Sequence, residues 1–297
     1  MKIRILILGI TSTVGYRFYK LNNDYDIYGI CRQWSLEKND KIYENMNVDI
    51  SFIENVINEI KPTIIINCIS WVNVDGCDEN PSKSERINYK FSVDIIDLIK
   101  KFNLKSIFFS SSLVYDGKNA PYSEESIASP LNQYAIAKCN VDEYIRAKLD
   151  NYLLLRPTTI FGVKENFQKD NPVNFIIQKL LCKEELYLVD DVVNNLIFED
   201  DLVYLMYILI NGDKVGEYNI GGDRPISRYE LGLTICKLMG QSGKLINRTN
   251  SNTFKCSANR PLDSSVDNSK IKKAVNYTFM DLDSSLKIII SKIVGEQ

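Results

Sequence analysis

Residues 3–15 read Ile-Arg-Ile-Leu-Ile-Leu-Gly-Ile-Thr-Ser-Thr-Val-Gly, and this stretch decides the fold. The apolar, β-branched run Ile3–Leu8 predicts a buried strand, and Val14–Leu21 has the pattern of a helix. Gly9 permits a tight turn between them, and Gly15 lets the helix pack closely on the strand. A helix N-terminus that follows a strand in this way binds the pyrophosphate of a dinucleotide. The alternative is a plain strand-to-helix turn.

The loop has the spacing Gly-x-x-Ser-x-x-Gly, in which Ser12 stands where a glycine usually lets the pyrophosphate approach the backbone. Its position at the N-terminal end of a strand–helix–strand pattern favours dinucleotide binding over a simple turn. The loop residues that we predict to contact the dinucleotide are Gly9, Thr11, Ser12, Thr13, Val14 and Gly15.

Strand and helix patterns alternate through the first half of the chain. Further strands are predicted at Ile27–Cys31, Thr63–Ile69, Ser106–Ser111 and Tyr152–Leu155, and further helices at Ser51–Ile60, Ser82–Phe102 and Leu131–Lys148. Ser51, with Glu54 three residues later, is the expected N-cap of its helix. Strands this apolar imply a parallel sheet covered by helices on both faces. Because such crossovers are right-handed, the fold class is α/β, a doubly wound, Rossmann-like sheet.

The pattern loosens after residue 160. Helices are predicted at Pro172–Leu181, Asp200–Asn211, Ser227–Met239 and Met280–Ile293, with a strand at Glu217–Ile220 and site-lining loops over Gln241–Asp267. Ser227 is the expected N-cap of its helix, with Glu230 at the capping-box position. We expect residues 1–160 to form the dinucleotide domain, with residues 189–220 returning to it. Residues 161–188 and 221–297 are expected to form a smaller C-terminal α/β region that binds the substrate.

Composition excludes several classes of function. The chain of 297 residues has 36 Lys and Arg against 38 Asp and Glu, so no excess positive charge predicts binding to nucleic acid or to a membrane surface. With no histidine, it has neither a Ser-His-Asp triad nor a histidine metal ligand, and no metal is expected. The seven cysteines include no Cys-x-x-Cys pair, and no apolar run approaches ~18 residues, so a cytoplasmic protein with reduced thiols is expected.

The pattern Tyr-x-x-x-Lys, which puts both side chains on one helix face, occurs at Tyr16/Lys20, Tyr134/Lys138 and Tyr144/Lys148. Only Tyr134 and Lys138 follow, by a single loop, the strand that ends at Ser110-Ser111-Ser112. Ligands bind beyond the carboxyl ends of the strands in such sheets, so these side chains can converge there. The alternative is a half-buried helix tyrosine beside serines that merely end a strand.

A catalytic role for these residues has a physical explanation. Hydride delivery to a carbonyl leaves an oxyanion, which Tyr134 can protonate. Lys138 and an oxidised nicotinamide would bring the pKa of Tyr134 down towards the working pH, and Lys138 would also hold the nicotinamide ribose. Ser111 would donate a hydrogen bond to the carbonyl oxygen.

The second predicted strand ends in Arg32-Gln33, where an enzyme that uses NADH would place an Asp or Glu for the ribose 2′-hydroxyl. A guanidinium pairs instead with a 2′-phosphate, so NADPH is the predicted cofactor, with NADH as the alternative. The other explanation of Arg32 is a solvated loop residue. Asp49 and Ile50 are expected to flank the adenine.

Together these features resemble the extended short-chain dehydrogenase/reductase family and, within it, the dTDP-4-dehydrorhamnose reductase group. The segments that carry the resemblance are Gly9 to Gly15, Asn67-Cys-Ile-Ser-Trp-Val-Asn-Val-Asp75, Phe109-Ser-Ser-Ser-Leu-Val-Tyr-Asp-Gly117, Pro130-Leu-Asn-Gln-Tyr-Ala-Ile-Ala-Lys138, Leu155-Arg-Pro157 and Arg260-Pro-Leu-Asp-Ser264. The resemblance spans nearly the whole chain. Its segments are specific in combination, although none of them is specific alone.

The resemblance implies roles for individual residues. Ser111, Tyr134 and Lys138 would be the catalytic triad. Cys68, Ile69 and Ser70 would line the cofactor, with Arg156 and Pro157 near the nicotinamide. The residues that would contact a nucleotide-diphosphate sugar are Val74, Ser111, Ser112, Asn174 and Arg260, and Arg260 is the expected partner of the diphosphate, or else a surface ion pair.

Three departures from the family pattern stand out. Ser12 replaces a glycine, Asp190-Asp-Val-Val-Asn-Asn195 lacks the usual Gln and Pro-Thr, and Thr159 replaces an aromatic residue. The last two fall in the sugar region and suggest that the sugar differs from the rhamnose precursor.

The resemblance implies NADPH-dependent reduction of the 4-keto group of a nucleotide-linked 4-keto-6-deoxy sugar, in deoxysugar or cell-surface polysaccharide biosynthesis. Two alternatives remain: a nucleotide-sugar 4-epimerase that keeps NAD bound, and a non-catalytic NADP-binding subunit like the regulatory subunit of methionine adenosyltransferase. A dehydratase is disfavoured because Ser112-Leu113 stand where its acid and base usually lie. Nothing in the sequence decides between a monomer and a homodimer.

Overall fold

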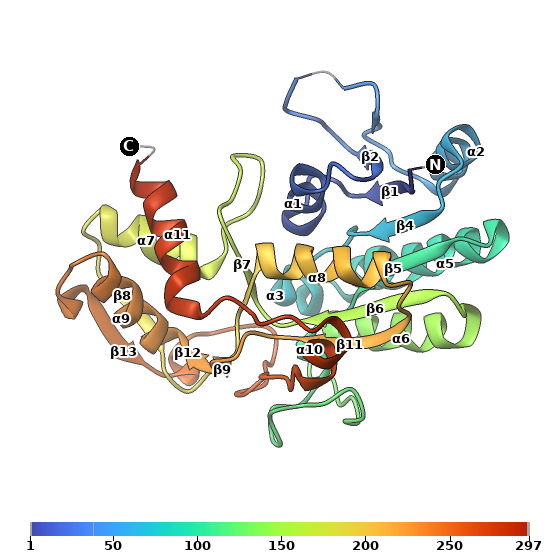
Figure 1. Cartoon of the computed structure of the whole chain (residues 1–297). Coiled ribbons are helices and arrows are strands. Elements are labelled where there is room, and N and C mark those ends of the chain that lie inside the picture. Colours follow the sequence, from blue (N-terminus) through green and yellow to red (C-terminus); the bar gives the residue numbers. More distant parts are fainter. Residues whose placement is uncertain (1, 38, 296–297) are drawn as a thin grey trace.

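A seven-stranded parallel sheet forms the centre of the protein in a computed structural model that describes residues 2–37 and 39–295 (Figure 1). In sheet order the strands are β11 (Gly216–Ile220), β6 (Tyr152–Pro157), β5 (Lys105–Phe109), β4 (Ile64–Asn67), β1 (Arg4–Leu8), β2 (Asp26–Cys31) and β3 (Ile42–Glu44). Each pairs in parallel with its neighbours. The order reverses beside β1, so the predicted doubly wound sheet is confirmed.

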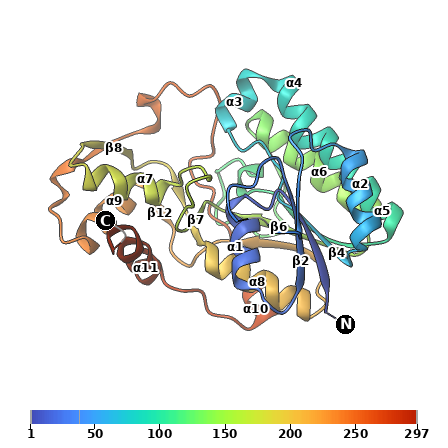
Figure 2. The same cartoon turned by 90° about the horizontal axis from the view of Figure 1, so that it is seen from above.

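Helices cover both faces of this sheet (Figure 2). One face carries α1 (Thr13–Leu21), α8 (Glu199–Asn211) and α10 (Ser269–Val275), and the other carries α2 (Ile50–Ile60), α5 (Phe91–Phe102) and α6 (Gln133–Lys148). Strands between two such layers have no face towards water. This explains why every residue of β4 is buried and why all but the last, Asn67, are apolar. The carboxyl ends of the strands therefore meet at one edge of a rigid layer.

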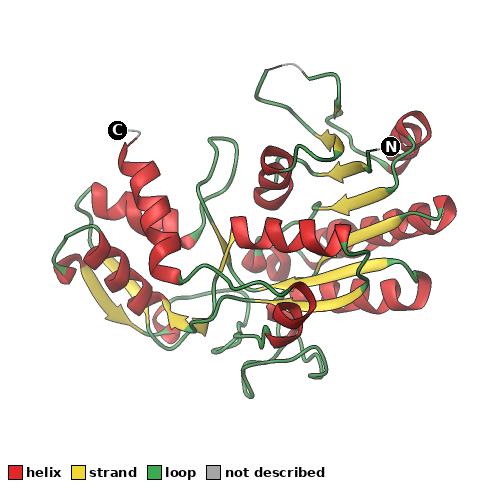
Figure 3. Cartoon of the chain, viewed as in Figure 1, coloured by secondary structure: helices red, strands yellow, loops and turns green. Residues whose placement is uncertain are grey.

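A smaller region lies beside this edge (Figure 3). It has its own apolar core. Its helices are α7 (Pro172–Leu181), α9 (Arg228–Leu238) and α11 (Leu282–Gly295). Its strand pairs are β8 (Leu186–Val189) with β13 (Ile246–Thr249), β9 (Val193–Asn194) with β12 (Ile226–Ser227), and β10 (Ile197–Phe198) with β7 (Ile160–Phe161). Between the two halves of this region the chain rejoins the large sheet through α8 and β11. No helix within the described ranges combines the length and apolarity needed to cross a bilayer.

Several predicted elements differ from the observed ones. The predicted helix Ser82–Phe102 is divided into α4 (Pro81–Ser84), a π-helical turn (Glu85–Lys90) and α5, and the short α3 (Val74–Glu79) precedes it. Short 3-10 turns occur at Ser112–Val114, Gly243–Leu245 and Ser251–Thr253. The segment Gln241–Asp267 was expected to be loops only, but it contains β13, because Ile246 joins the core under α9 and its strand pairs with β8.

Two predicted helix caps had different outcomes. The capping box at Ser227 and Glu230 is confirmed: the Ser227 hydroxyl accepts from Glu230 N at 3.1 Å, and the Glu230 carboxylate accepts from Ser227 N at 3.0 Å. The predicted N-cap Ser51 is wrong. Helix α2 begins at Ile50, so Asp49 is the cap and its carboxylate accepts from Phe52 N at 2.8 Å.

Candidate active site

The turn between β1 and α1 is packed too tightly for side chains at its two glycines. Gly9 has φ +77°, and a Cβ there would lie 3.2 Å from Ile69 Cγ1. A Cβ at Gly15 would lie 3.0 Å from the carbonyl oxygen of Gly9. The two glycines therefore let the start of α1 sit directly above the strand, with its N–H groups at the carboxyl edge of the sheet. This arrangement fits a dinucleotide pyrophosphate.

Ser12 fits this turn without a glycine. Its φ of −65° is available to any residue, and its hydroxyl caps α1 by accepting from Gly15 N at 3.1 Å. Its own N–H donates to Gly9 O at 3.0 Å. The departure from the family pattern at Ser12 thus replaces a small residue by a helix cap and leaves the shape of the turn intact.

A segment from the smaller region reaches back to this turn. Gln168 Nε2 donates to Ser12 O at 3.2 Å and to Thr11 O at 3.4 Å. The neighbouring Phe167 ring meets Tyr16 edge-on at 5.2 Å. No periodic pattern in the sequence predicts this contact, because it joins residues more than 150 positions apart. It places the loop before α7 beside the proposed pyrophosphate site.

At the predicted adenosine end, Arg32 follows β2 and is exposed. Among the described residues, no carboxylate lies within ion-pair distance of Arg32, so its charge is available to a ligand. Asp49 and Ile50 lie at the start of α2, where Asp49 already serves as the helix cap. Contacts of these residues with adenosine remain a prediction.

Ser111, Tyr134 and Lys138 come together beyond the carboxyl end of β5. Ser111 follows this strand and caps the 3-10 turn after it. Tyr134 and Lys138 lie in the first two turns of α6, which Asn132 caps. Lys138 Nζ donates to Phe109 O at 2.9 Å and lies 5.7 Å from the centre of the Tyr134 ring. The hydrogen bond to the last residue of β5 thus holds the Lys138 ammonium close to the Tyr134 ring.

Burial controls the protonation of this group. Removal from water raises the pKa of Tyr134 to about 12, against the opposing effect of hydrogen bonds from the Ser111 and Ser70 hydroxyls. Burial also lowers the pKa of Lys138 to about 8, against the attraction of Asp142. The expectation that Lys138 and an oxidised nicotinamide bring this pKa down towards the working pH concerns the complex with cofactor and stays a prediction, whereas in the protein alone desolvation of the phenol dominates. Tyr134 is therefore protonated at neutral pH, as a proton donor must be.

Sequence reasoning missed Asn88, which lies buried on the π-helical turn. Its side-chain oxygen accepts from Trp71 N at 2.7 Å and from the Ser70 hydroxyl at 3.0 Å, and its nitrogen donates to Trp71 O at 3.1 Å. Asn88 thereby holds the loop after β4 with Ser70 near the Tyr134 hydroxyl. Asn88 stands among polar and charged residues in the sequence, so no local pattern singled it out.

A buried ionic network supports the site from below. Asp142 lies one turn after Lys138 and accepts from the Ser110 hydroxyl at 2.8 Å and from Arg156 Nε at 3.1 Å. Arg156 also bonds Glu217 on β11 at 2.5 Å. The Arg156 side chain is only 4% exposed and pairs with these two carboxylates, and its expected position near the nicotinamide stays a prediction. Its side chain therefore joins α6, β6 and β11.

The residues expected to contact substrate are distributed around the same edge. Val74 begins α3, Ser112 is buried after β5, and Asn174 lies in the first turn of α7 with Nδ2 donating to Gly162 O at 3.0 Å. Arg260 makes a two-bond ion pair with Asp75, at 3.0 and 2.6 Å. Since Asp75 neutralises it, Arg260 brings no uncompensated charge to a diphosphate.

Comparison with known proteins gives the family. The family described as RmlD substrate binding domain matches residues 2–294. The chain belongs to this family. A curated relative, dTDP-4-dehydrorhamnose reductase from Aggregatibacter actinomycetemcomitans, is 24% identical over 96% of this chain and 98% of its own length.

Two further comparisons place this RmlD-family chain among other proteins. Methionine adenosyltransferase 2 subunit beta from Bos taurus is 27% identical over 56% of this chain, and the match spans only 49% of that subunit. The crystal structure of dTDP-4-dehydrorhamnose reductase from Bacillus anthracis, in complex with NADP, is 20% identical and superposes with a TM-score of 0.87 over 98% of this chain and 100% of that one. At this identity the superposition supports the fold.

Proposed function

We propose that this RmlD-family chain is an oxidoreductase that uses NADPH to reduce the 4-keto group of a nucleotide-linked 4-keto-6-deoxy sugar. The observation that carries the proposal is the meeting of Tyr134, Lys138 and Ser111 at the sheet edge that also holds the glycine turn. The named activity of the full-length relative supports the same reaction.

The residues present fit a nicotinamide dinucleotide. The turn from Gly9 to Gly15 would hold its pyrophosphate, Arg32 its 2′-phosphate, Asp49 and Ile50 its adenine, and Cys68, Ile69, Ser70 and Pro157 its nicotinamide half. When bound, NADPH supplies a hydride to the C4 carbonyl carbon. Ser111 donates a hydrogen bond to the carbonyl oxygen, and Tyr134 gives that oxygen the proton that completes the alcohol. Lys138 stabilises the phenolate that Tyr134 becomes.

The cofactor preference is tested by Arg32→Ala. A charge-assisted hydrogen bond contributes about 1.5–3 kcal/mol, so NADPH should bind roughly 10–100-fold more weakly while NADH binding stays unchanged. Calorimetric titration of both cofactors measures this. Arg86→Ala is the matched control, since Arg86 is also exposed, and it should alter neither affinity. Equal losses for NADPH and NADH would remove the 2′-phosphate role of Arg32.

The reaction is tested by following NADPH oxidation with 4-keto-6-deoxy sugars linked to dTDP, UDP, GDP and CDP. We expect turnover with at least one of them and release of the oxidised cofactor in each cycle. NADPH binding without turnover of any sugar would favour a non-catalytic, NADP-binding role. The partial match to the methionine adenosyltransferase subunit is the reason to test for it. Purification with NAD that does not exchange would favour an epimerase.

A further inference from the structure

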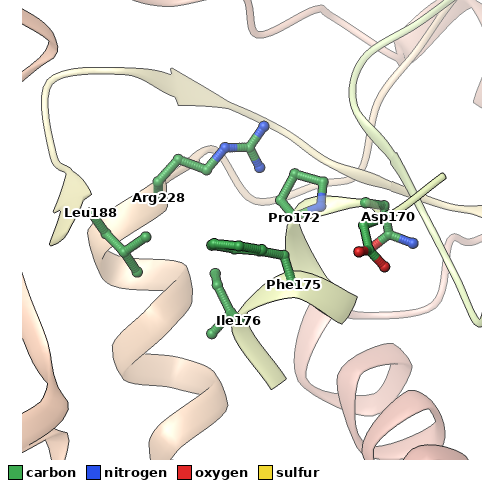
Figure 4. Close-up of a pocket in the computed structure, with 7 residues that line it drawn as sticks. Asp170, Pro172, Phe175, Ile176, Leu188 and Arg228 are labelled. Carbon is green, nitrogen blue, oxygen red and sulfur yellow. The ribbon is translucent and has the colours of Figure 1, made fainter. Parts of the chain in front are cut away.

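A cavity of about 390 Å³ lies between the first turns of α7 and α9, in the smaller region. Pro172 and Phe175 of α7 form one side of it, and Arg228, the first residue of α9, forms another. Figure 4 shows the Arg228 side chain extending from α9 towards Pro172. The reduction proposed above assigns no role to the residues that line this cavity.

Arg228 is a cation that lacks a counter-ion. Its Nη2 donates to the Thr159 hydroxyl at 3.2 Å, but its Nη1 is enclosed and has no hydrogen-bond partner among the described residues. Asp170, the carboxylate beside the cavity, pairs instead with Lys164 at 2.7 Å. Burial lowers the pKa of Arg228 to about 10, so the guanidinium still carries its charge at neutral pH. Enclosing an unpaired charge is unfavourable unless a ligand completes it.

The other arginines differ from Arg228 in this respect. Within the described part of the chain, only Arg32 and Arg86 likewise lack a carboxylate in ion-pair distance, and both are exposed to water. Arg260, the residue first expected to meet a diphosphate, is neutralised by Asp75. Arg228 is therefore the described arginine that is partly buried, with Nη1 enclosed, and whose charge has no carboxylate partner.

A second buried atom without a partner is connected to Arg228 through Thr159. The Thr159 hydroxyl that accepts from Arg228 also accepts from Asn194 Nδ2 at 2.9 Å. The remaining side-chain oxygen of Asn194 is buried without a described partner, as is that of Asn174 on α7. Thr159 and Asn194 are two of the positions where the sequence departs from its family, so these departures lie together in space and lead to Arg228.

We propose that Arg228 binds the phosphate oxygens of the sugar nucleotide in this cavity; the identity of the ligand rests on the proposed function. A guanidinium donates charge-assisted hydrogen bonds to phosphate, and Nη1 of Arg228 has no partner among the described residues. The positive ends of the α7 and α9 dipoles face the same cavity and add to the attraction.

The test is calorimetric titration of the full chain, without NADPH, using dTDP and UDP, with thymidine and uridine as phosphate-free probes. Arg228→Gln should bind the nucleoside diphosphates at least tenfold more weakly, while both nucleosides bind as they do to the unmodified chain. Arg224→Gln is the matched control, because Arg224 is exposed and pairs with Asp283; its affinities should change less than twofold. Unchanged affinity in Arg228→Gln, or no binding of either diphosphate by the unmodified chain, would overturn the proposal.

A second probe separates phosphate from a carboxylate carried by the sugar. If Arg228→Gln loses affinity for UDP-glucuronic acid but keeps that for UDP, the anion is the sugar carboxylate and the phosphate assignment is wrong. Thermal unfolding distinguishes a ligand role from a structural one. Removal of an unpaired enclosed charge should leave the midpoint unchanged or raise it, whereas a lower midpoint with unchanged affinity would make Arg228 structural. None of these measurements requires turnover, so their result is independent of the proposed reduction.

Discussion

Replacing Tyr134 by Phe should reduce the rate of NADPH-dependent reduction at least about 100-fold and leave NADPH affinity within twofold, because positioned proton transfer contributes roughly 10²–10⁴. The substitution removes one hydroxyl from a ring that α6 holds in place. The rate should be measured at pH 7, where burial keeps Tyr134 protonated and Lys138, with its pKa of about 8, mostly charged.

A second tyrosine on the same helix provides the control. Tyr144 also precedes a lysine by four residues, but its hydroxyl donates to Asp97 at 2.9 Å at the surface. Tyr144→Phe should therefore keep the full rate. If both variants, or neither, lost activity, Tyr134 would not be the acid, and the reductase proposal would lose its central residue.

Much of the large sheet could be predicted because its signals are local. The buried strands are apolar runs, and the residues of the glycine turn lie within seven positions of one another. Tyr134 and Lys138 were found because sheet topology selects one of three identical patterns. Their pKa values could not be predicted, since these depend on how completely the surrounding strands and helices exclude water.

The sugar side of the site was harder to predict because its contacts join distant segments. The sequence marked Thr159 and Asn194 as unusual but contained no sign that both would bond to one another beside Arg228. It predicted Arg260 as the partner of a diphosphate or as a surface ion pair, but it could not name Asp75, 185 positions away, as the residue that pairs with it. The short strand β13 was not predicted for the same reason, because it is defined by its pairing with β8 and not by its periodicity.

The buried network below Lys138 leads to the largest expected change in stability. Arg156→Met should lower the free energy of unfolding by about 3–5 kcal/mol at pH 7.5, because Asp142 would lose its buried cationic partner while nearly out of contact with water. Urea unfolding measures the loss. Arg146→Met is the matched control: Arg146 also bonds Glu217 but is half exposed, so its loss should cost about 1 kcal/mol or less.

The pH dependence of this defect follows from the two carboxylates. Burial already raises the pKa of Asp142, and without Arg156 it should rise further, so folding would favour the protonated acid. Stability from such a group is present at low pH and is lost as pH rises through its folded pKa. Burial opposes the ionisation of Glu217, but hydrogen bonds from Arg146 and Arg156 hold its pKa at about 2, and in the variant Arg146 still pairs with it. The loss in Arg156→Met should therefore be smaller at pH 5 than at pH 7.5; a loss that grew towards pH 5 would assign the stabilisation to Glu217 rather than to Asp142.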